Sequence, residues 1–136
     1  MRVLTTKNID PEKLGTLWTA IGWKLRDRKK WIEVLSKSSF VCSVWNKNNL
    51  VGFGRILEDG IMCMFYDIAV HPDFQGKHKI GPTIMKILIS QVKNKKYASI
   101  GLFSWEPNEK NNLKFYERFG FKIVKGMELI KYMERE

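Results

Sequence analysis

The stretch DIAVHPDFQGKHKIGPTIM, residues 67–85, decides the fold, because a strand, a loop and a helix follow one another within it. Branched and alternating apolar residues predict a strand over residues 61–70. Apolar residues then recur at three- and four-residue spacing from Pro82 to Lys95, which predicts an amphipathic helix. The loop between these two elements therefore leads directly into a helix N-terminus.

A loop at a helix N-terminus is a candidate site for a phosphate group. The first turn of a helix has backbone N–H groups without partners, and the helix dipole adds positive potential there. Glycines let the backbone approach an anion closely, and lysines add charge. An ordinary solvated basic loop is the alternative interpretation. The candidate anion-binding residues are Gln75, Gly76, Lys77, His78, Lys79, Ile80, Gly81 and Pro82.

The other segments predict an α/β protein of the α+β type with a mostly antiparallel sheet. Asp10 as N-cap and Pro11 at the first helical position start a helix that ends at Gly22. Turn-forming residues separate the central apolar segments, which predicts a three-strand meander. The further expected strands are 2–6, 40–45, 50–57, 99–105, 121–124 and 128–133, and the further expected helices are 27–36 and 110–119.

Length and composition predict one globular domain over residues 1–136, with 44% hydrophobic residues. The net charge of +10 fits a nucleic acid or a small polyanion, but the 24 basic residues are spread over the whole chain, which argues against dedicated nucleic-acid binding. No apolar run is long enough to span a membrane and the N-terminus lacks a signal-peptide core, so a cytoplasmic location is expected. Cys42 and Cys63 lack metal-ligand spacing, so we expect no metal and two reduced thiols, with a disulfide left open.

Two segments resemble the signatures of the GNAT superfamily of acyl-CoA-dependent N-acyltransferases. Residues 67–85 are similar to its central signature, in which a strand ending in Val-x-Pro is followed by Gln/Arg-x-x-Gly-x-Gly/Ala and a helix. The segment NNLKFYERFGF, residues 111–121, resembles the second signature, in which a Tyr-containing helix leads to Gly-Phe. The chain departs from the family pattern at the two glycine positions. These hold His78 and Ile80 or, with one inserted residue, Lys79 and Gly81.

The resemblance implies the family's fold, a mixed, mostly antiparallel sheet of six to seven strands that is splayed at its centre and flanked by about four helices. It also implies acetyl-CoA as the acyl donor, bound where the parallel strands 61–70 and 99–105 diverge. The backbone of Ile68, Ala69 and Val70 would pair with the pantetheine arm, and the pyrophosphate would meet the loop 75–81. The departures from the signature imply a bulged loop, or fewer backbone donors and more side-chain charge.

The reaction that the resemblance implies is acetyl transfer to a primary amine, which must lose a proton before it attacks. By its place in FYERFGF, Tyr116 is expected to be the general acid. Asp67, the acid inside the central strand, is the candidate base; Glu58 and Asp59 are weaker candidates, and proton loss through water is the alternative. The candidate cofactor contacts near the second signature are Asn108, Asn111 and Asn112.

The acceptor site of the family is normally built by the first two helices, the loop between them and nearby strands. Trp23 could form an apolar wall, and Lys24, Arg26 and Arg28 could attract an acidic part of the acceptor, although a solvated basic loop is equally consistent. The expected acceptor is a small-molecule amine, with a protein amine as the alternative. A non-catalytic acyl-CoA-binding domain and a basic nucleic-acid-binding domain are the competing functions. The oligomeric state is left open, a homodimer included.

Overall fold

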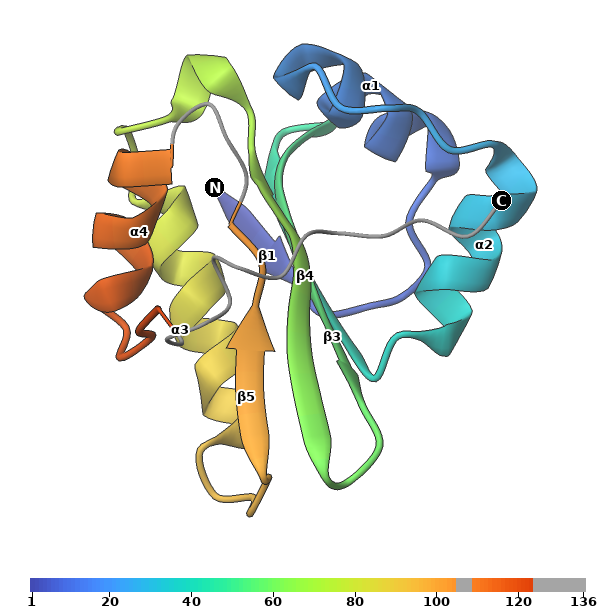
Figure 1. Cartoon of the computed structure of the whole chain (residues 1–136). Coiled ribbons are helices and arrows are strands. Elements are labelled where there is room, and N and C mark those ends of the chain that lie inside the picture. The colour runs from blue at the N-terminus through green and yellow to red at the C-terminus, as the bar shows by residue number, and fades with distance from the viewer. Residues whose placement is uncertain (105–108, 124–136) are drawn as a thin grey trace. The chain divides into compact units, whose positions relative to one another are not determined.

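The computed structural model describes residues 1–104 and 109–123 of the chain (Figure 1). The chain divides into two compact units, Met1–Leu102 and Phe103–Glu136. None of the described helices is long and apolar enough to cross a membrane. The strands are β1 (Arg2–Leu4), β2 (Phe40–Asn46), β3 (Asn49–Glu58), β4 (Met62–Val70) and β5 (Ser99–Leu102). The helices are α1 (Pro11–Ile21), α2 (Arg28–Lys37), the short 3₁₀ helix η1 (Pro72–Phe74), α3 (Ile80–Val92) and α4 (Glu109–Glu117).

The five strands form one sheet in the order in which they occur in the chain. Strands β1 to β4 pair antiparallel, whereas β5 runs parallel to β4. The predicted mixed, mostly antiparallel sheet is therefore confirmed, with five described strands rather than six or seven. Residues 121–123, predicted as part of a sixth strand, are not in strand conformation. The rest of that strand and the predicted strand 128–133 lie outside the described residues.

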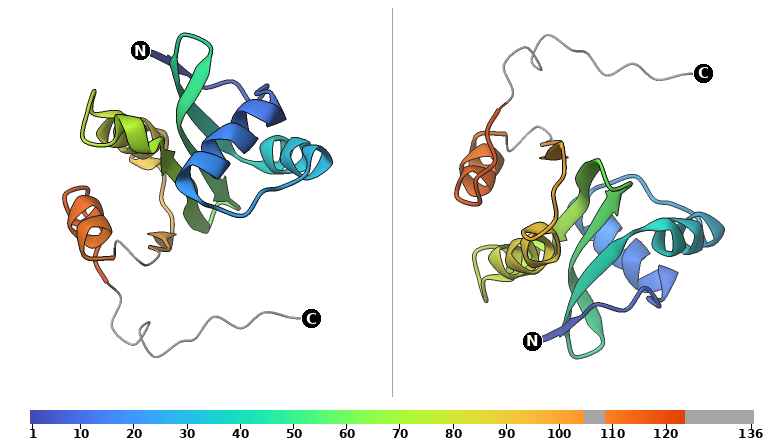
Figure 2. Two further views of the ribbon diagram at one scale, coloured as in Figure 1. Left: turned by 90° about the horizontal axis from the view of Figure 1, so that it is seen from above. Right: turned by 90° about the horizontal axis from the view of Figure 1, so that it is seen from below.

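Helix α3 covers one face of the sheet, where two glycines of β3 leave room for it (Figure 2). A Cβ atom on Gly52 would lie 2.6 Å from Cγ2 of Ile80, and one on Gly54 would lie 2.7 Å from Cγ2 of Ile84. Both isoleucines are buried. The helix begins two residues before the predicted start at Pro82, because proline is tolerated in the first helical turn.

Helices α1 and α2 cover the opposite face over an aromatic core. Trp18 from α1, Trp31 from α2 and Phe53 from β3 are buried and meet edge to face, with ring centroids 4.7 to 6.1 Å apart. Aromatic pairs in this geometry add stability beyond the burial of their surface. Phe53 lies between the two glycines that face α3, so alternate residues of β3 serve opposite faces.

The loop between α1 and α2 is fixed at both ends by capping residues. Helix α1 begins at the predicted N-cap, Asp10, and ends at Gly22, whose φ of 87° is left-handed. Helix α2 has Asp27 as N-cap, and its carboxylate accepts a hydrogen bond from the N–H of Lys30 at 2.7 Å. The intervening residues 22–27 form the loop that was expected near the acceptor.

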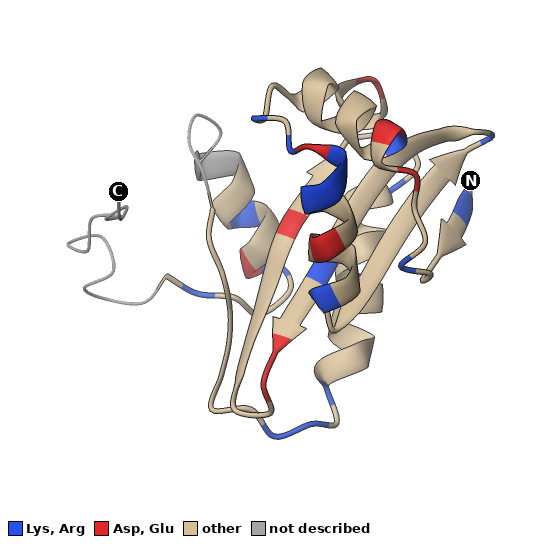
Figure 3. Cartoon of the chain, turned by 90° about the vertical axis from the view of Figure 1, so that its right-hand side faces the viewer, with Lys and Arg blue, Asp and Glu red and all other residues tan. Residues whose placement is uncertain are grey.

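The exposed face of α2 mixes basic and acidic side chains (Figure 3). Lys30 and Lys37 form ion pairs with Glu33 at 3.1 and 3.0 Å. These two contacts lower the pKa of Glu33, with the hydrogen bond from Lys37 as the largest cause. The basic residues of this helix surface are therefore partly neutralised by their own neighbours.

In the unit Phe103–Glu136, α4 is followed by a glycine turn. The N–H of Gly120, which has a φ of 90°, donates to the carbonyl of Glu117 at 3.0 Å. The rings of Tyr116 and Phe121 lie 6.4 Å apart, on either side of this turn. The helix predicted over 110–119 is therefore confirmed, and it ends two residues earlier because the left-handed glycine terminates it.

Candidate active site

Strand β4 extends beyond the end of its parallel partner. Pairing between β4 and β5 runs from Met62–Ser99 to Phe65–Leu102 and stops there. On its other edge, β4 stays paired with β3 up to Val70. Residues 66–70 therefore have no strand partner on one edge within the described part of the chain. An unpaired strand edge presents N–H and C=O groups that another extended chain can use.

A β-bulge interrupts β4 within this open segment. Asp67 and Ile68 together lie opposite the single residue Gly54 of β3, since the pairing passes from Arg55–Tyr66 directly to Phe53–Ala69. Asp67 has a φ of 56°, in the left-handed region that non-glycine residues seldom adopt. Aspartate tolerates this conformation better than most residues, and bulges of this kind redirect a side chain.

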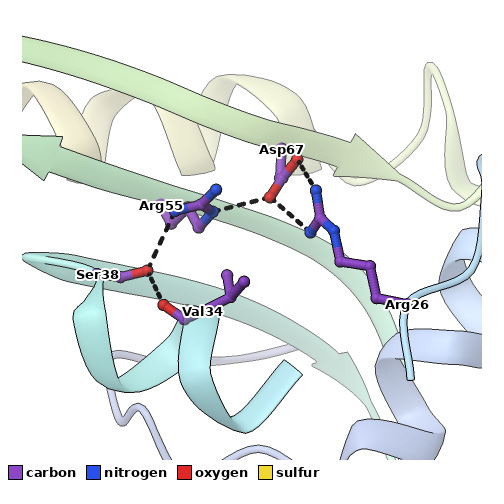
Figure 4. Close-up of polar contacts among 5 residues, drawn as sticks. All are labelled: Arg26, Val34, Ser38, Arg55 and Asp67. Carbon is purple, nitrogen blue, oxygen red and sulfur yellow. Dashed lines mark hydrogen bonds and ion pairs between the residues drawn. The ribbon is translucent and has the colours of Figure 1, made fainter. Parts of the chain in front are cut away.

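The side chain of Asp67 accepts three hydrogen bonds from two arginines (Figure 4). Its Oδ2 accepts from Nη1 of Arg26 at 2.9 Å and from Nε of Arg55 at 2.8 Å. Its Oδ1 accepts from Nη2 of Arg26 at 3.1 Å. The side chains of Asp67 and Arg55 are 14% and 13% exposed, so this network is largely shielded from water. It links the loop between α1 and α2 to β3 and β4.

This environment determines the protonation of Asp67. Burial by itself raises the pKa of a carboxyl group, but the hydrogen bonds and charges of Arg26 and Arg55 outweigh it and lower the pKa of Asp67. A carboxylate with a lowered pKa and three donors on its oxygens is a weak proton acceptor. The contacts of Asp67 therefore favour a role in positioning over the role of a general base.

Aromatic rings hold both guanidinium groups from the sides. Cζ of Arg26 lies 4.6 Å from the ring centroid of Trp31 and 5.5 Å from that of Trp18. Cζ of Arg55 lies 5.2 Å from the ring of Tyr66. Cation–π contacts of this kind strengthen when water is excluded. Each guanidinium group therefore contacts both the carboxylate of Asp67 and at least one aromatic ring.

The loop after β4 is held by short-range contacts. The Nδ1 atom of His71 accepts from the N–H of Asp73 at 3.1 Å and caps η1. The side-chain amide of Gln75 donates to the carbonyl of Val70 at 3.1 Å, which ties the loop back to the end of β4. Gly76, His78 and Lys79 then all have positive φ values, of 72°, 59° and 52°. The backbone thus reverses direction immediately before α3.

Five backbone N–H groups in and after this loop have no intramolecular acceptor among the described residues. They belong to Gly76, His78, Lys79, Ile80 and Gly81. The helical hydrogen bonds start only at Thr83, whose N–H donates to the carbonyl of Lys79 at 3.0 Å. Successive free amides in left-handed and helix-start conformations form a concave site for anions. Lys77 and Lys79 add exposed positive charge.

Ile80 is buried. When the signature is aligned without a gap, Ile80 occupies its second glycine position. It is 2% exposed and occupies the space above Gly52 of β3. The side chain of Ile80 therefore points into the core and leaves its N–H available at the start of the helix. At the first position, His78 adopts the left-handed conformation for which a glycine would be favoured.

Comparison with known proteins decides the family. A family profile described as an acetyltransferase (GNAT) domain matches residues 37–123, which include the bulged strand, the loop and α4. The chain belongs to the GNAT acetyltransferase family. The fold and the resemblance predicted from the two signatures are thereby confirmed.

Relatives of this GNAT protein span most of its length. The protein of Porphyra purpurea named uncharacterized N-acetyltransferase ycf52 is 36% identical over 133 residues, which cover 94% of this chain and 72% of that protein. GCN5-related N-acetyltransferase 1, chloroplastic, of Arabidopsis thaliana is 29% identical over 136 residues, which cover 93% of this chain and 66% of that protein. The crystal structure of a probable acetyltransferase from methicillin-resistant Staphylococcus aureus has the same fold, with a TM-score of 0.80 at 24% identity over 98% of this chain and 100% of that one.

The second GNAT signature lies in the unit Phe103–Glu136. Tyr116 is half-buried on α4, and burial raises the pKa of its phenol, so the group stays protonated at neutral pH. Asn112 lies on the same helix. Asn108 lies outside the described residues, and the side chain of Asn111 is not among those described. The roles of these four residues stay predictions.

Sequence reasoning missed Arg55 and the pairing of Arg26 with Asp67 in the candidate GNAT site. Arg55 was not singled out, although it is a charged residue in the middle of the apolar strand NLVGFGRILE. Asp67 is likewise an acid inside an apolar strand, MCMFYDIAV. Opposite charges inside consecutive strands of a meander are a signal for a buried ion pair, because each needs a partner there. The pairing of Arg26 with Asp67 had no comparable signal, because Arg26 lies in a loop with several other basic residues.

Proposed function

We propose that this GNAT protein transfers an acetyl group from acetyl-CoA to a primary amine. The observation that carries the proposal is that the open edge of β4, residues 66–70, leads within one short loop into five free amides. Acetyl-CoA has the matching order of groups: a thioester, a chain with two amides, and a pyrophosphate. A ligand laid along β4 would meet donors suited to each part in turn.

In this proposal, the open backbone edge of Ile68, Ala69 and Val70 pairs with the amides of the pantetheine arm. The pyrophosphate takes the N–H groups of Gly76, His78, Lys79, Ile80 and Gly81, while Gln75 holds the loop to β4 and Lys77 contributes charge. Pro82, which has no N–H, only shapes the first turn of α3. The loss of two family glycines is offset because His78 accepts the left-handed conformation and Ile80 fits above Gly52.

The chemistry requires one bond to form and one to break. The neutral amine attacks the thioester carbonyl; a C–N bond forms, the C–S bond breaks, and one proton leaves the nitrogen while the thiolate gains one. We assign the donated proton to Tyr116, a role supported by the second signature and by the raised pKa of its phenol. The proton of the amine passes to water, because Asp67 is occupied by Arg26 and Arg55, and the Tyr116 phenolate then regains a proton from water, which closes the balance.

The proposal includes the whole chain as one acetyltransferase domain, and the family match across residues 37–123 supports it because it crosses the boundary between the two compact units. A small-molecule amine is the proposed acceptor. The relative from Arabidopsis thaliana is named as chloroplastic, so a plastid is the alternative compartment to the predicted cytoplasm.

Two measurements test the proposed function. Isothermal titration calorimetry should show that coenzyme A binds at least about tenfold more tightly than pantetheine, which lacks the pyrophosphate. Release of free thiol from acetyl-CoA, followed over a panel of primary amines, should depend on the amine. Tight binding of coenzyme A without turnover of any amine would favour a non-catalytic binding domain, and equal affinities for coenzyme A and pantetheine would refute the phosphate site.

A further inference from the structure

Among the described residues, the cluster of Arg26, Arg55 and Asp67 carries a net charge of +1. Arg26 and Arg55 each carry a positive charge, and in the part of the chain that the structure describes Asp67 is the only acid in ion-pair contact with either. The three side chains are 28%, 13% and 14% exposed. A part-buried cluster with a net charge of +1 favours the binding of an anion, because a shielded charge without a counter-charge costs free energy.

Both guanidinium groups keep hydrogen-bond donors that Asp67 does not use. Asp67 takes Nη1 and Nη2 of Arg26 but not its Nε–H, and it takes Nε–H of Arg55 but not its two Nη groups. Nη1 of Arg55 reaches the hydroxyl of Ser38 only at 3.4 Å, while that hydroxyl donates to the carbonyl of Val34 at 2.7 Å. Within the described residues, Nε of Arg26 and Nη2 of Arg55 have no hydrogen-bond partner.

The cluster is built rigidly enough to select a ligand. The rings of Trp18, Trp31 and Tyr66 hold the guanidinium groups in place, so little side-chain entropy remains to be lost on binding. Planar guanidinium groups suit carboxylates, with which they form paired hydrogen bonds.

The location of the cluster connects it with the acceptor. Asp67 belongs to the open segment of β4, and Arg26 belongs to the loop between α1 and α2. This loop and the start of α2 also carry the exposed Lys24, Arg28 and Lys29, which outnumber the neighbouring Asp27 and Asp10, the latter 4.0 Å from Arg28. Basic and acidic positions of this region are both marked in Figure 3. A positive potential on this side attracts anionic molecules and repels polycations.

We propose that the acceptor of this enzyme is a small amine that also carries a carboxylate, and that Arg26 and Arg55 bind this carboxylate through the donors that Asp67 leaves free. The inference rests on the proposed function and names its acceptor class. An amino-acid-like acceptor supplies the missing negative charge. A polyamine adds positive charge to a cluster that already has an excess, and is a poor substrate.

Matched acceptors that differ only by a carboxylate test the inference. Two pairs serve: phenylalanine with phenethylamine, and γ-aminobutyrate with propylamine. The ratio of kcat/KM for the carboxylate-bearing amine to that for its partner should be about ten or more in the wild-type protein, because a carboxylate gains charge-assisted hydrogen bonds from guanidinium donors that a plain amine leaves to water. A ratio of one or less for both pairs, at pH values where each amine has the same neutral fraction, overturns the inference while leaving the acetyltransferase activity established.

Charge variants of the cluster provide a second test. Removing an arginine and removing Asp67 should shift the kcat/KM ratio in opposite directions. Arg55→Gln and Arg26→Gln remove the net positive charge and should bring the ratio close to one. Asp67→Asn adds to the net positive charge and should raise the ratio, whatever it does to overall activity. Lys86→Gln is the matched control: this exposed residue on α3 undergoes the same loss of charge on the other face of the sheet, and its ratio should equal that of the wild type. A variant that merely damages the fold lowers kcat/KM for both acceptors by the same factor and leaves the ratio unchanged. An unchanged ratio in Arg55→Gln therefore overturns the inference.

A binding measurement keeps the inference testable even without turnover. In a ¹⁵N-labelled protein, N-acetylphenylalanine should shift the side-chain N–H resonances of Arg26 and Arg55 in a saturable way, and N-acetylphenethylamine should not. These shifts should disappear in Arg55→Gln. Identical responses to the two compounds overturn the carboxylate site, whereas failure of the proposed function appears separately, as the absence of thiol release with every amine.

Discussion

The carboxylate of Asp67 and the guanidinium of Arg26 form a two-pronged ion pair, with hydrogen bonds of 2.9 and 3.1 Å, although 41 positions separate them in the sequence. This pair fastens the loop between α1 and α2 to the bulge of β4. The bulge lies in the strand segment proposed to pair with the pantetheine arm, and the loop is the one expected near the acceptor. The pair therefore fixes the distance between the α1–α2 loop and the bulge of β4.

Removal of the Asp67 carboxylate should destabilise the fold. Asp67→Ala leaves two part-buried guanidinium groups without a counter-charge, and we expect a loss of about 2 kcal/mol in the free energy of unfolding, less than for a fully buried pair because Arg26 is partly exposed. Urea denaturation measures it. Asp73→Ala, at a side chain that is 84% exposed, is the control and should change stability by less than about 0.5 kcal/mol. Equal effects of both variants would contradict the structural role of Asp67.

The contribution of Asp67 to stability should depend on pH only in the acid range. Its pKa is lower in the folded protein than in the unfolded chain, so the unfolded chain binds more protons there and stability rises with pH. The contribution is fully present above the unfolded pKa of about 3.9 and is lost as the pH falls through the folded pKa. The difference in unfolding free energy between wild type and Asp67→Asn should therefore be flat from about pH 5 to 7 and shrink below about pH 4. A difference that grows on acidification would mean that the pKa is raised instead.

The approach of α3 to the sheet should tolerate no side chain at position 52. Gly52→Ala places a methyl group 2.6 Å from Cγ2 of the buried Ile80 and should cost about 1 to 3 kcal/mol. Ile80→Ala should rescue part of that loss, so the double variant costs less than the sum of the two single variants. Gly15→Ala is the matched control, because a Cβ atom there meets nothing within 4 Å, and it should stabilise α1 slightly. Strict additivity of the two core substitutions would refute the contact.

The phenol of Tyr116 should matter for turnover and not for binding. If it donates the proton to the leaving thiolate, Tyr116→Phe lowers kcat by about tenfold or more and leaves the Kd for acetyl-CoA nearly unchanged. Steady-state kinetics and calorimetry on the same preparation separate the two effects. An unchanged kcat removes Tyr116 from the mechanism, and a large increase in Kd assigns it to binding.

Most secondary structure could be predicted because its signals are local. The caps at Asp10 and Gly22 set α1 as expected, and turn residues set the meander of β2, β3 and β4. Errors occurred at boundaries: α3 starts at Ile80 rather than Pro82, and β5 ends at Leu102 rather than at residue 105. A propensity pattern indicates which conformation a segment favours. The last paired residue of a strand depends instead on where the hydrogen-bonding partner in the neighbouring strand ends.

The candidate site was predicted unevenly for the same reason. The loop 75–82 was found because its glycines, lysines and helix start are contiguous in the sequence. Asp67 was found as an acid in the central strand, but its expected role as a base does not fit its surroundings, since Arg26 and Arg55 reach it from distant segments. The pKa of a side chain is set by such neighbours, and a single sequence does not name them.

The sequence by itself determined the elements, their order, the two family signatures and the basic loop at the start of a helix, because periodicity, capping and turn chemistry act over a few residues. Only the tertiary structure decided where β4 and β5 part, how Gly52 accommodates Ile80, and that two arginines hold Asp67. These features depend on strand register and on contacts between segments far apart in the chain, and a shift of one residue in register would place each side chain on the other face of the sheet.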